Sequence, residues 1–437
     1  MSGTTRRNFL AGAATATGVL ATARSRGAIA GANERVRVAI LGAGNQGKRH
    51  AESLMTLKDI EIAYVCDIDE HRLAEQVART EGRAKPVGDF RRILDDASVD
   101  AVTIPLPDHW HVPAALLSLD AGKHIYVEKP CSHNIREGRL LVDAVRRHKK
   151  VAAHGTQARS TPGIQEAMQM LREGVIGDVL LAKCWNWQLR EDIGRKQPSD
   201  PPPNVNYDAW VGPAEWLPYQ ENRFHYHWHW WYNFGTGDVG NDGAHEFDIA
   251  LWGLGVDKHP SLVVAAGGKY FFDDDQQFPD TAQVTLEWPG DGKPGDKRML
   301  IYEQRLWSTS YPFNVDAGNE FIGTKGRMFV SKRGKFEVRG ERNAPIDRKL
   351  EGVIKSETEF NHRNWIDCIK DGGTPNASIE IAHRTAAAAH LGNMAIRTGR
   401  AIHFDPETET VAGDEEATAL LGRKYRAEGH WAIPRGA

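Results

Sequence analysis

The sequence predicts an α/β protein with two domains, the first of them a doubly wound parallel sheet. Segments that favour strands and helices alternate over about the first third of the chain, as in parallel sheets with crossover helices. A glycine-rich turn joins the first strand to the first helix. Later segments alternate apolar and polar residues, like strands with one solvated face. The length of 437 residues exceeds one typical domain.

The first strand, turn and helix form the most informative stretch of the chain. Residues 36–41 are an apolar run that predicts a strand, and residues 48–55 favour a helix. A second apolar run, 60–66, ends at the acid Asp67. The turn has the spacing G-x-G-x-x-G and consists of Gly42, Ala43, Gly44, Asn45, Gln46 and Gly47.

This arrangement is typical of a dinucleotide-binding unit. The glycines let the backbone turn tightly and approach a pyrophosphate, and the N-terminus of the helix offers free N–H groups to it. An acid at the tip of the second strand accepts hydrogen bonds from ribose hydroxyls and repels the additional phosphate of NADP. Asp67 therefore favours NAD, although Arg72 is close enough in sequence to meet the phosphate of NADP. The alternative is a glycine-rich turn without a ligand.

The rest of the first domain continues the alternation. We expect helices at 70–79, 111–121 and 135–148, and strands at 99–104, 124–127 and 151–154. Ligands of such sheets bind beyond the carboxyl ends of the strands. Three motifs should therefore share one edge of the sheet, namely the glycine-rich turn, residues 105–111 and Glu128-Lys129-Pro130.

The chain begins with a segment typical of a twin-arginine export signal. Arg6 and Arg7 precede a weakly apolar run that is too short to span a bilayer. Ala28-Ile29-Ala30 fits a cleavage site, so we expect a signal at 1–30 and a periplasmic or otherwise exported protein. A disordered basic tail is the alternative. Because this route carries folded proteins, we expect a cofactor that is bound tightly before export.

Composition argues against several classes of partner. The net charge of −3 becomes −7 once the four arginines of the signal are removed, which disfavours nucleic acid and anionic membranes. No later apolar stretch reaches the roughly 18 residues that a membrane span needs. The four cysteines match neither a zinc pair nor a redox pair. We expect buried thiols, although export would permit a disulfide.

The run from Ala121 to Pro130, AGKHIYVEKP, closely resembles the Gfo/Idh/MocA oxidoreductases. The resemblance includes residues 107–111, 237–245 and 248–255 and covers nearly all of the chain after the signal. It implies a Rossmann domain, placed here at 31–155, and a second α+β domain, at 156–437. The second domain would have an open, mainly antiparallel sheet, of which one face lines the active site and the other assembles dimers or tetramers.

Strand and helix patterns in the second domain agree with that architecture. Residues 179–187 and 282–288 alternate apolar and polar side chains, which predicts strands. Residues 379–398 predict a long helix that packs back on the structure.

The pattern points to Lys129 and His245 as the catalytic residues. A lysine beside a nicotinamide can bond the reacting oxygen and stabilise developing negative charge. The imidazole of His245 can accept the hydroxyl proton in oxidation and return it in reduction. The family pattern D-x-G-x-H puts an acid four residues earlier on one helical turn, where this chain has Asn241. Otherwise Lys129 is a surface lysine and His245 a core histidine.

Cofactor contacts are expected at both strand-end motifs as well as at the turn. The resemblance implies that Glu128 meets the ribose on the nicotinamide side and that Pro107, Asp108 and His109 lie near the nucleotide. Lys129 completes this group of cofactor contacts.

A dense aromatic segment between residues 207 and 234 points to a sugar. Aromatic rings stack on the C–H faces of sugars, and nearby polar groups bind the hydroxyls. The candidate substrate contacts are Arg159, Asn241, His225 and Trp230. The segment can also be an aromatic core or a subunit interface. On a strand, the alternating His225, His227 and His229 would suit zinc, but the family needs no metal and none is expected.

These residues favour an oxidoreductase that moves a hydride between NAD, or NADP, and a hydroxyl or carbonyl of a sugar, polyol or glycoside. The second hypothesis is an NAD-dependent glycoside hydrolase, in which transient oxidation of a ring carbon permits elimination of the aglycone. Members resembling that group tend to lack the lysine of E-K-P, so Lys129 argues against it. A noncatalytic sugar-binding protein is the third hypothesis, and the presence of Lys129 and His245 disfavours it.

Overall fold

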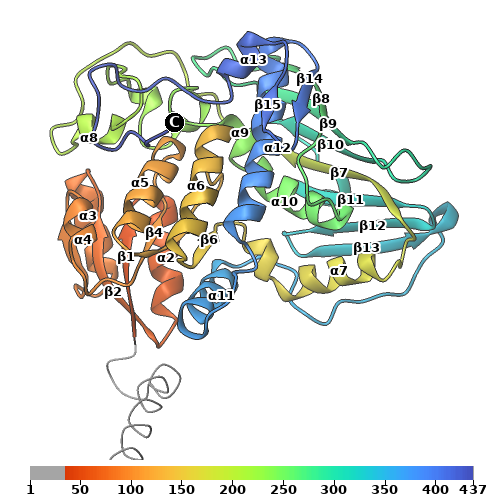
Figure 1. Ribbon diagram of the computed structural model, residues 1–437, viewed down its shortest axis with the longest axis horizontal. Coiled ribbons are helices and arrows are strands. Elements are labelled where there is room, and N and C mark those ends of the chain that lie inside the picture. The colour runs from red at the N-terminus through yellow and green to blue at the C-terminus, as the bar shows by residue number, and fades with distance from the viewer. Residues whose placement is uncertain (1–34, 437) are drawn as a thin grey trace, which may run out of the picture.

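The computed structural model describes residues 35–436, which fold around two sheets that lie side by side (Figure 1). The export signal expected at 1–30 lies outside the described residues. None of the helices within 35–436 is long and apolar enough to cross a bilayer. All four cysteines are buried and unpaired, which confirms the expectation of buried thiols.

The first sheet has six parallel strands in the order β3-β2-β1-β4-β5-β6, as expected of a doubly wound fold. Its strands are β1 (Val36–Leu41), β2 (Ile60–Cys66), β3 (Lys85–Val87), β4 (Ala101–Ile104), β5 (His124–Val127) and β6 (Ala152–His154). Its helices are α2 (Asn45–Met55), α3 (Glu70–Arg79), α4 (Arg91–Leu94), α5 (Asp108–Asp120) and α6 (Ile135–His148). The order reverses between β1 and β4, which opens the crevice where ligands bind in such folds.

Two helices begin three residues earlier than the sequence predicts. Helix α2 starts at Asn45 because Gly44 has extended backbone angles and serves as its N-cap, so the last glycine of the motif lies in the first turn. Helix α5 starts at Asp108, directly after the extended Pro107, and this acid lies where the helix dipole favours negative charge.

The second sheet has nine strands in the order β13-β12-β11-β7-β10-β9-β8-β14-β15. They are β7 (Val179–Trp187), β8 (Leu262–Gly268), β9 (Thr281–Trp288), β10 (Arg298–Arg305), β11 (Ala317–Gly323), β12 (Gly326–Ser331), β13 (Lys335–Gly340), β14 (Ile402–Asp405) and β15 (Thr410–Val411). Only β7 and β10 run parallel among these pairs, so the expectation of a mainly antiparallel sheet is confirmed.

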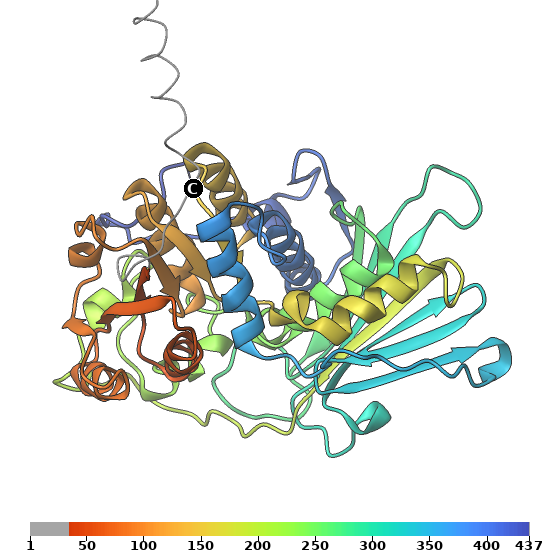
Figure 2. The same ribbon diagram turned by 90° about the horizontal axis from the view of Figure 1, so that it is seen from below.

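Helices cover one face of the second sheet (Figure 2). The helices that follow β6 along the chain, not all of which contact this sheet, are α7 (Pro162–Arg172), α8 (Tyr207–Val211), α9 (Gly237–Gly240), α10 (Gly243–Leu254), α11 (Thr358–Asp371), α12 (Ile379–Thr398) and α13 (Glu415–Ala419). Residues of α7, α10 and α12 share one apolar core with the strands. The predicted long helix is α12, and its amino-terminal part also belongs to the core of the first sheet.

Candidate functional site

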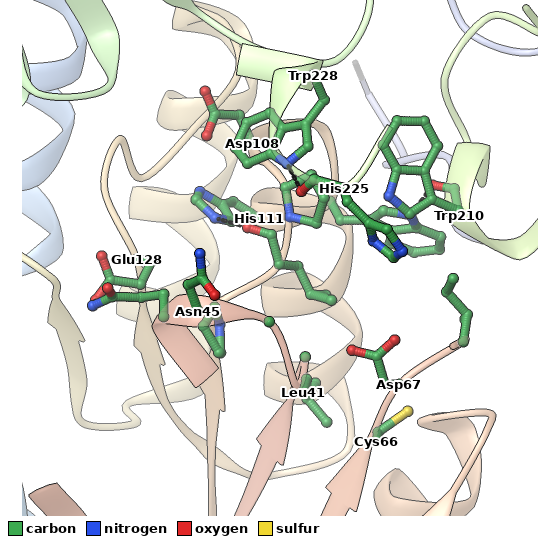
Figure 3. Close-up of a pocket in the computed structure, with 18 of the residues that line it drawn as sticks. Leu41, Asn45, Cys66, Asp67, Asp108, His111, Glu128, Trp210, His225 and Trp228 are labelled. Atoms are coloured by element: carbon green, nitrogen blue, oxygen red, sulfur yellow. Dashed lines mark hydrogen bonds between the residues drawn. The ribbon is translucent and has the colours of Figure 1, made fainter. Parts of the chain in front are cut away.

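A cavity of about 790 Å³ opens at the carboxyl edge of the parallel sheet, where the sequence places its three motifs. The ends of β1, β2, β4 and β5 line one side, and residues 206–229 line the other. Figure 3 shows Asp67 and Glu128 at opposite sides of this cavity, with Asn45 of α2 between them. The cavity therefore extends from the tip of β2 to the tip of β5.

The glycine-rich turn leaves no room for a side chain at Gly42 or Gly47. Gly42 has a φ of +115°, and a Cβ on Gly47 would lie 1.9 Å from the carbonyl oxygen of Gly42. The backbone itself therefore forms the wall of the cavity in front of the N-terminus of α2. This cradle fits the pyrophosphate of a dinucleotide, which is bound by backbone N–H groups at such a helix end.

Asp67 lies at the tip of β2, and the turn fixes its carboxylate. One oxygen accepts a hydrogen bond from the N–H of Ala43 at 2.6 Å, and the other accepts one from the N–H of Asp69 at 2.9 Å. Burial raises the pKa of Asp67, and the two backbone hydrogen bonds oppose that rise. Because the residue lines the cavity, its remaining lone pairs can accept ribose hydroxyls. Arg72 lines the same wall.

Glu128 lies at the other side, at the end of β5, and is buried. Its Oε1 accepts hydrogen bonds of 2.9 Å from the side-chain amide of Gln46 and from Nε2 of His50. Burial opposes ionisation, but the hydrogen bond and charge of His50 and the charge of Lys129 hold the pKa of Glu128 below its usual range. The absence of a side chain at Gly155 makes room for this carboxylate.

Lys129 contacts Asn241, which comes from the second half of the chain. The Lys129 ammonium donates to Oδ1 of Asn241 at 2.6 Å, and Nδ2 of Asn241 donates to Asp238 at 3.0 Å. Both residues line the cavity. Lys129 and Asp238 together fix the orientation of the Asn241 amide, with its oxygen toward the lysine and its nitrogen toward the acid.

Arg190 binds the two acids next to this pair, Asp238 and Asp242. Its guanidinium donates to both carboxylate oxygens of Asp238, at 2.5 and 3.0 Å, and to Asp242 at 2.5 Å. The hydroxyl of Tyr226 accepts a further hydrogen bond from Arg190 at 2.9 Å. The charge of Arg190 keeps the pKa of Asp242 low in spite of burial.

His245 lies in the first turn of α10, close to this network. Burial lowers its pKa well below the ordinary value, and the charges of Lys332 and Lys129 lower it further. The expectation that Asn241 and His245 share one helical turn is wrong, because Asn241 caps α9 and α10 begins only at Gly243. His245 is partly buried and is not among the described residues that line the cavity.

Most residues of the 107–111 motif line the cavity, but His109 lies in the core. Pro107 and Asp108 line the cavity, as does His111. Burial raises the pKa of Asp108 to about 7, although the hydroxyl of Thr236 donates to its carboxylate at 2.7 Å. His109 is buried behind them and bonds the carbonyl oxygen of Trp210 at 2.9 Å.

The four candidate substrate contacts are not brought together. Asn241 and His225 line the cavity, and His225 also pairs with Asp69 at 3.0 Å. Arg159 instead donates to both carboxylate oxygens of Asp248, at 3.1 and 2.9 Å, within the buried interior. Trp230 is 3% exposed and belongs to the aromatic core.

Most rings of the aromatic segment form a core and not a sugar platform. The segment makes a short 3-10 turn, η3 (His227–Trp230), in place of the strand on which three histidines would share a face. Trp228 and His229 line the cavity, and Nδ1 of His229 donates to the carbonyl of Tyr226. Burial lowers the pKa of His229 to about 3, so Nε2 of the neutral ring is left as an acceptor.

Several residues that line the cavity had no signal in the sequence. Arg190 follows β7, and Arg333 comes from the turn between β12 and β13. His430 and Trp431 come from the last residues of the chain. Only the tertiary fold brings such distant segments together, since neither spacing nor periodicity relates them to the nucleotide motif.

One group outside the cavity has the residue types of a metal site. His259, His383 and Glu409 offer ligand atoms within 4.8 Å of one another. Both imidazole Nε2 atoms lie 2.9 Å from the same oxygen of Glu409. Arg139 also donates to both oxygens of Glu409, so a cation already neutralises this carboxylate. The cluster joins the segment between α10 and β8, helix α12 and the turn that precedes β15, with Arg139 of α6 beside it.

Two family models match the chain. The model described as "Oxidoreductase family, NAD-binding Rossmann fold" matches residues 36–156. The model described as "Oxidoreductase family, C-terminal alpha/beta domain" matches residues 169–286. Both belong to the Gfo/Idh/MocA group, and together they cover more than half of the chain.

Solved structures share the fold over most of the chain at low sequence identity. Levoglucosan dehydrogenase in complex with NADH and levoglucosan has a TM-score of 0.65 and 18% identity, with 84% of this chain and 99% of that chain covered. Aldose-aldose oxidoreductase from Caulobacter crescentus, complexed with glycerol, has a TM-score of 0.66 and 17% identity, with 85% and 100% covered. These likenesses establish the fold.

Curated relatives match over a shorter stretch. Glycosyl hydrolase family 109 protein 1 of Shewanella sp. (strain ANA-3) is 30% identical over 181 residues, which are 38% of this chain and 39% of the relative. The family 109 protein of Shewanella baltica (strain OS155) is 28% identical over 221 residues, or 43% and 48%. The chain thus spans less than half the length of these relatives.

Proposed function

Because the chain belongs to the Gfo/Idh/MocA oxidoreductases and carries their NAD-binding Rossmann domain, we propose that it is a carbohydrate oxidoreductase. Its reaction transfers a hydride between NAD and a hydroxyl or carbonyl carbon of a sugar, polyol or glycoside. The observation that carries the proposal is the Lys129–Asn241 pair, which lines the same cavity as the nucleotide cradle. The carbohydrate ligands named for two solved relatives support this substrate class.

Residues of the first domain hold the cofactor. The turn from Gly42 to Gly47 takes the pyrophosphate, and Asp67 takes the adenosine ribose. Glu128, ionised and fixed by Gln46, takes the ribose on the nicotinamide side. NAD supplies the hydride chemistry when it is bound.

Lys129 orients and polarises the reacting oxygen of the substrate. Asn241 accepts one of the three ammonium hydrogens, so the other two can be donated to substrate. A fixed positive charge beside that oxygen stabilises the negative charge that develops on it during oxidation. The lysine does not need to move for this, because its partner is itself held by Asp238.

We propose that His245 moves the proton. It lies in the first turn of α10, three residues after Asp242, which lines the cavity. Its lowered pKa leaves the imidazole neutral at neutral pH, so a ring nitrogen can accept the hydroxyl proton during oxidation. In reduction the same ring returns the proton. Lys129 and Lys332 both disfavour the imidazolium, which makes the protonated ring a stronger acid toward the product oxygen.

The test begins with identification of the nucleotide released when the purified protein is denatured. A panel of sugars, polyols and glycosides is then followed by the absorbance of reduced nicotinamide. We expect Lys129→Ala to lower kcat by about 10²- to 10³-fold, the effect of removing one donor from a developing oxyanion, while NAD binding is retained.

Lys48→Ala is the matched control. Lys48 lies on α2 beside the glycine-rich turn and pairs at the surface with Glu75 at 3.4 Å. Its removal should leave kcat unchanged. An equal loss of turnover and nucleotide binding in Lys129→Ala would make Lys129 a cofactor-docking residue and contradict the proposed role.

The names of the curated relatives favour a second candidate, glycoside hydrolysis through transient oxidation of the sugar ring. The two reactions differ in their products. Release of free reducing sugar from a glycoside without net formation of reduced cofactor would establish hydrolysis. Net reduction of NAD, matched by oxidised sugar, would establish the oxidoreductase.

Export, retention of the cofactor and assembly complete the proposal. A twin-arginine signal would carry the folded protein out with its nucleotide bound, and the open face of the second sheet would join copies into dimers or tetramers. Fractionation of cells that produce the full chain tests the first point. The mass of the purified protein in solution, measured by light scattering, tests the last.

A further inference from the structure

The last residues of the chain return to the first domain and line its nucleotide cavity. Residues 420–436 follow α13 and run back across the molecule toward α5 and α6 (Figure 1). We define residues 423–431 as the C-terminal strap. Its His430 and Trp431 line the cavity.

Buried contacts hold the beginning of the strap. Arg423 donates to Glu137 of α6 at 2.7 Å and to the carbonyl oxygen of His109 at 2.8 Å. The hydroxyl of Tyr425 donates to the same Glu137 at 2.6 Å. Because Glu137 is fully buried, these charge-assisted hydrogen bonds fix the course of the chain.

A second set of contacts ties the strap to the aromatic segment. The backbone N–H of Arg426 donates to the carbonyl of Pro213 at 3.0 Å, and its guanidinium pairs with Asp208 at 2.7 Å. The strap is therefore held from both sides before it reaches the cavity.

Three aromatic rings meet where the strap ends. The rings of Phe90 and Trp431 lie 5.7 Å apart between centroids, those of Trp110 and Trp431 lie 5.9 Å apart, and those of Phe90 and Trp110 lie 5.7 Å apart. The guanidinium of Arg91 lies 4.5 Å from the centre of the Trp431 ring. All four residues line the cavity.

This aromatic corner lies at the adenosine end. Phe90 and Arg91 follow β3, the edge strand next to β2, whose tip carries the ribose acid Asp67. Glu128 and Lys129 follow β5, on the other side of the reversal in strand order. An NAD molecule whose adenosine ribose meets Asp67 therefore directs its adenine toward the β3 side.

Exposure separates Trp431 from its two neighbours. Phe90 and Trp110 are 9% and 5% exposed, whereas Trp431 is 45% exposed. An indole anchored on one side and open toward a cavity offers a face for stacking, and stacking on an aromatic ring stabilises a bound base.

We propose that Trp431 is an adenine-binding residue and that the C-terminal strap slows the release of NAD. The inference rests on NAD binding in this cavity and is independent of the sugar and of the reaction. It gives a physical basis for a cofactor that stays bound between turnovers.

The test compares two partly exposed tryptophans that differ in position. Trp187 also faces a guanidinium, that of Arg305 at 3.7 Å, but it does not line the cavity and Arg305 lies outside the strap. The dissociation rate of NADH is measured by its fluorescence after dilution into excess NAD, so no substrate is needed. The nucleotide that remains in the purified protein is measured in parallel.

We expect Trp431→Ala to release NADH about 10- to 100-fold faster, which is the effect of losing one base–aromatic stack. Trp431→Phe should retain most of the slow release, and Trp187→Ala should match the parent. Equal release from the parent and Trp431→Ala would overturn the inference while leaving NAD binding intact. Absence of NAD binding in the parent protein would instead contradict the proposed function itself.

Discussion

The two ends of the cavity differ in what would hold a ligand there, namely shape at the adenosine end and buried polar groups at the reacting end. The adenosine end is shaped by backbone and rings, with a turn that excludes side chains and an aromatic corner at Trp431. The reacting end is a network of buried polar groups. Asn241 bonds both Lys129 and Asp238 there, and Asp238 in turn accepts from Arg190, at 2.5 to 3.0 Å. Shape alone can hold a ligand tightly, whereas moving a proton requires groups whose charge states are controlled.

The difference also appears in how each end responds to substitution. At Gly42 and Gly47 an added methyl group should be as harmful as a lost contact, because it would meet backbone atoms at less than 3 Å. At the reacting end the charge of a side chain should matter more than its volume, since burial and the charges of Lys332 and Lys129 together lower the pKa of His245. Substitutions at each end should therefore separate binding from turnover.

The largest effect is expected from Gly47→Ala. Its Cβ would lie 1.9 Å from the carbonyl oxygen of Gly42, so the turn must open and lose its fit to the pyrophosphate. We expect the Kd for NAD, measured by titration calorimetry, to rise by about 100-fold or more.

Gly268→Ala is the control for that experiment. Gly268 ends β8 and does not line the cavity, and a Cβ there would meet only the ring of Tyr270, at an ordinary 3.6 Å. Its Kd should stay near that of the parent. If the two alanine variants had the same Kd for NAD, the steric role assigned to the glycine-rich turn would be wrong.

A large effect confined to turnover is expected from His245→Gln. Loss of the proton acceptor should lower kcat for oxidation by about 10²-fold or more, while the Kd for NAD is unchanged. In the parent protein the pKa of His245 is lowered, so the neutral base persists as the pH falls below 6.5. The kcat of the parent should thus fall only well below pH 6.5. A fall centred at the ordinary imidazole pKa would contradict this assignment.

The smallest effect is expected from Asn241→Asp, which restores the acid of the family pattern. The new carboxylate favours the imidazolium form and therefore raises the pKa of His245 relative to the parent. The acidic limb of the pH profile of kcat should move to higher pH. Asn233→Asp is the control, since the Asn233 amide bonds the carbonyl of Glu215 away from the cavity. An unchanged profile in Asn241→Asp would place His245 outside the reach of residue 241.

Local patterns in the sequence were enough to predict the parallel sheet. The alternation of apolar runs and amphipathic segments gave α3, β5, α6 and α12 with the observed bounds. The glycine spacing and Asp67 also located one edge of the cavity, because the carboxyl ends of parallel strands must meet. These features depend on neighbours in the chain.

Features that depend on tertiary packing were not predictable. Arg159 looked available for substrate, yet Asp248 of α10 neutralises it in the interior. The aromatic segment matched a sugar platform by composition, but burial against its own rings turns most of it into core. The reach of the strap back to the first sheet spans hundreds of residues, and no periodicity in the sequence encodes such a contact.

The strap has a consequence for the order of events during synthesis. The ribosome completes the glycine-rich turn and Asp67 early, but the opposing wall at Trp431 emerges several hundred residues later. A nascent first domain can meet the nucleotide only through an open site. The complete pocket wall, and with it the slow exchange that we propose, arises after translation has passed the strap, so nucleotide loading is finished by the carboxyl-terminal part of the chain.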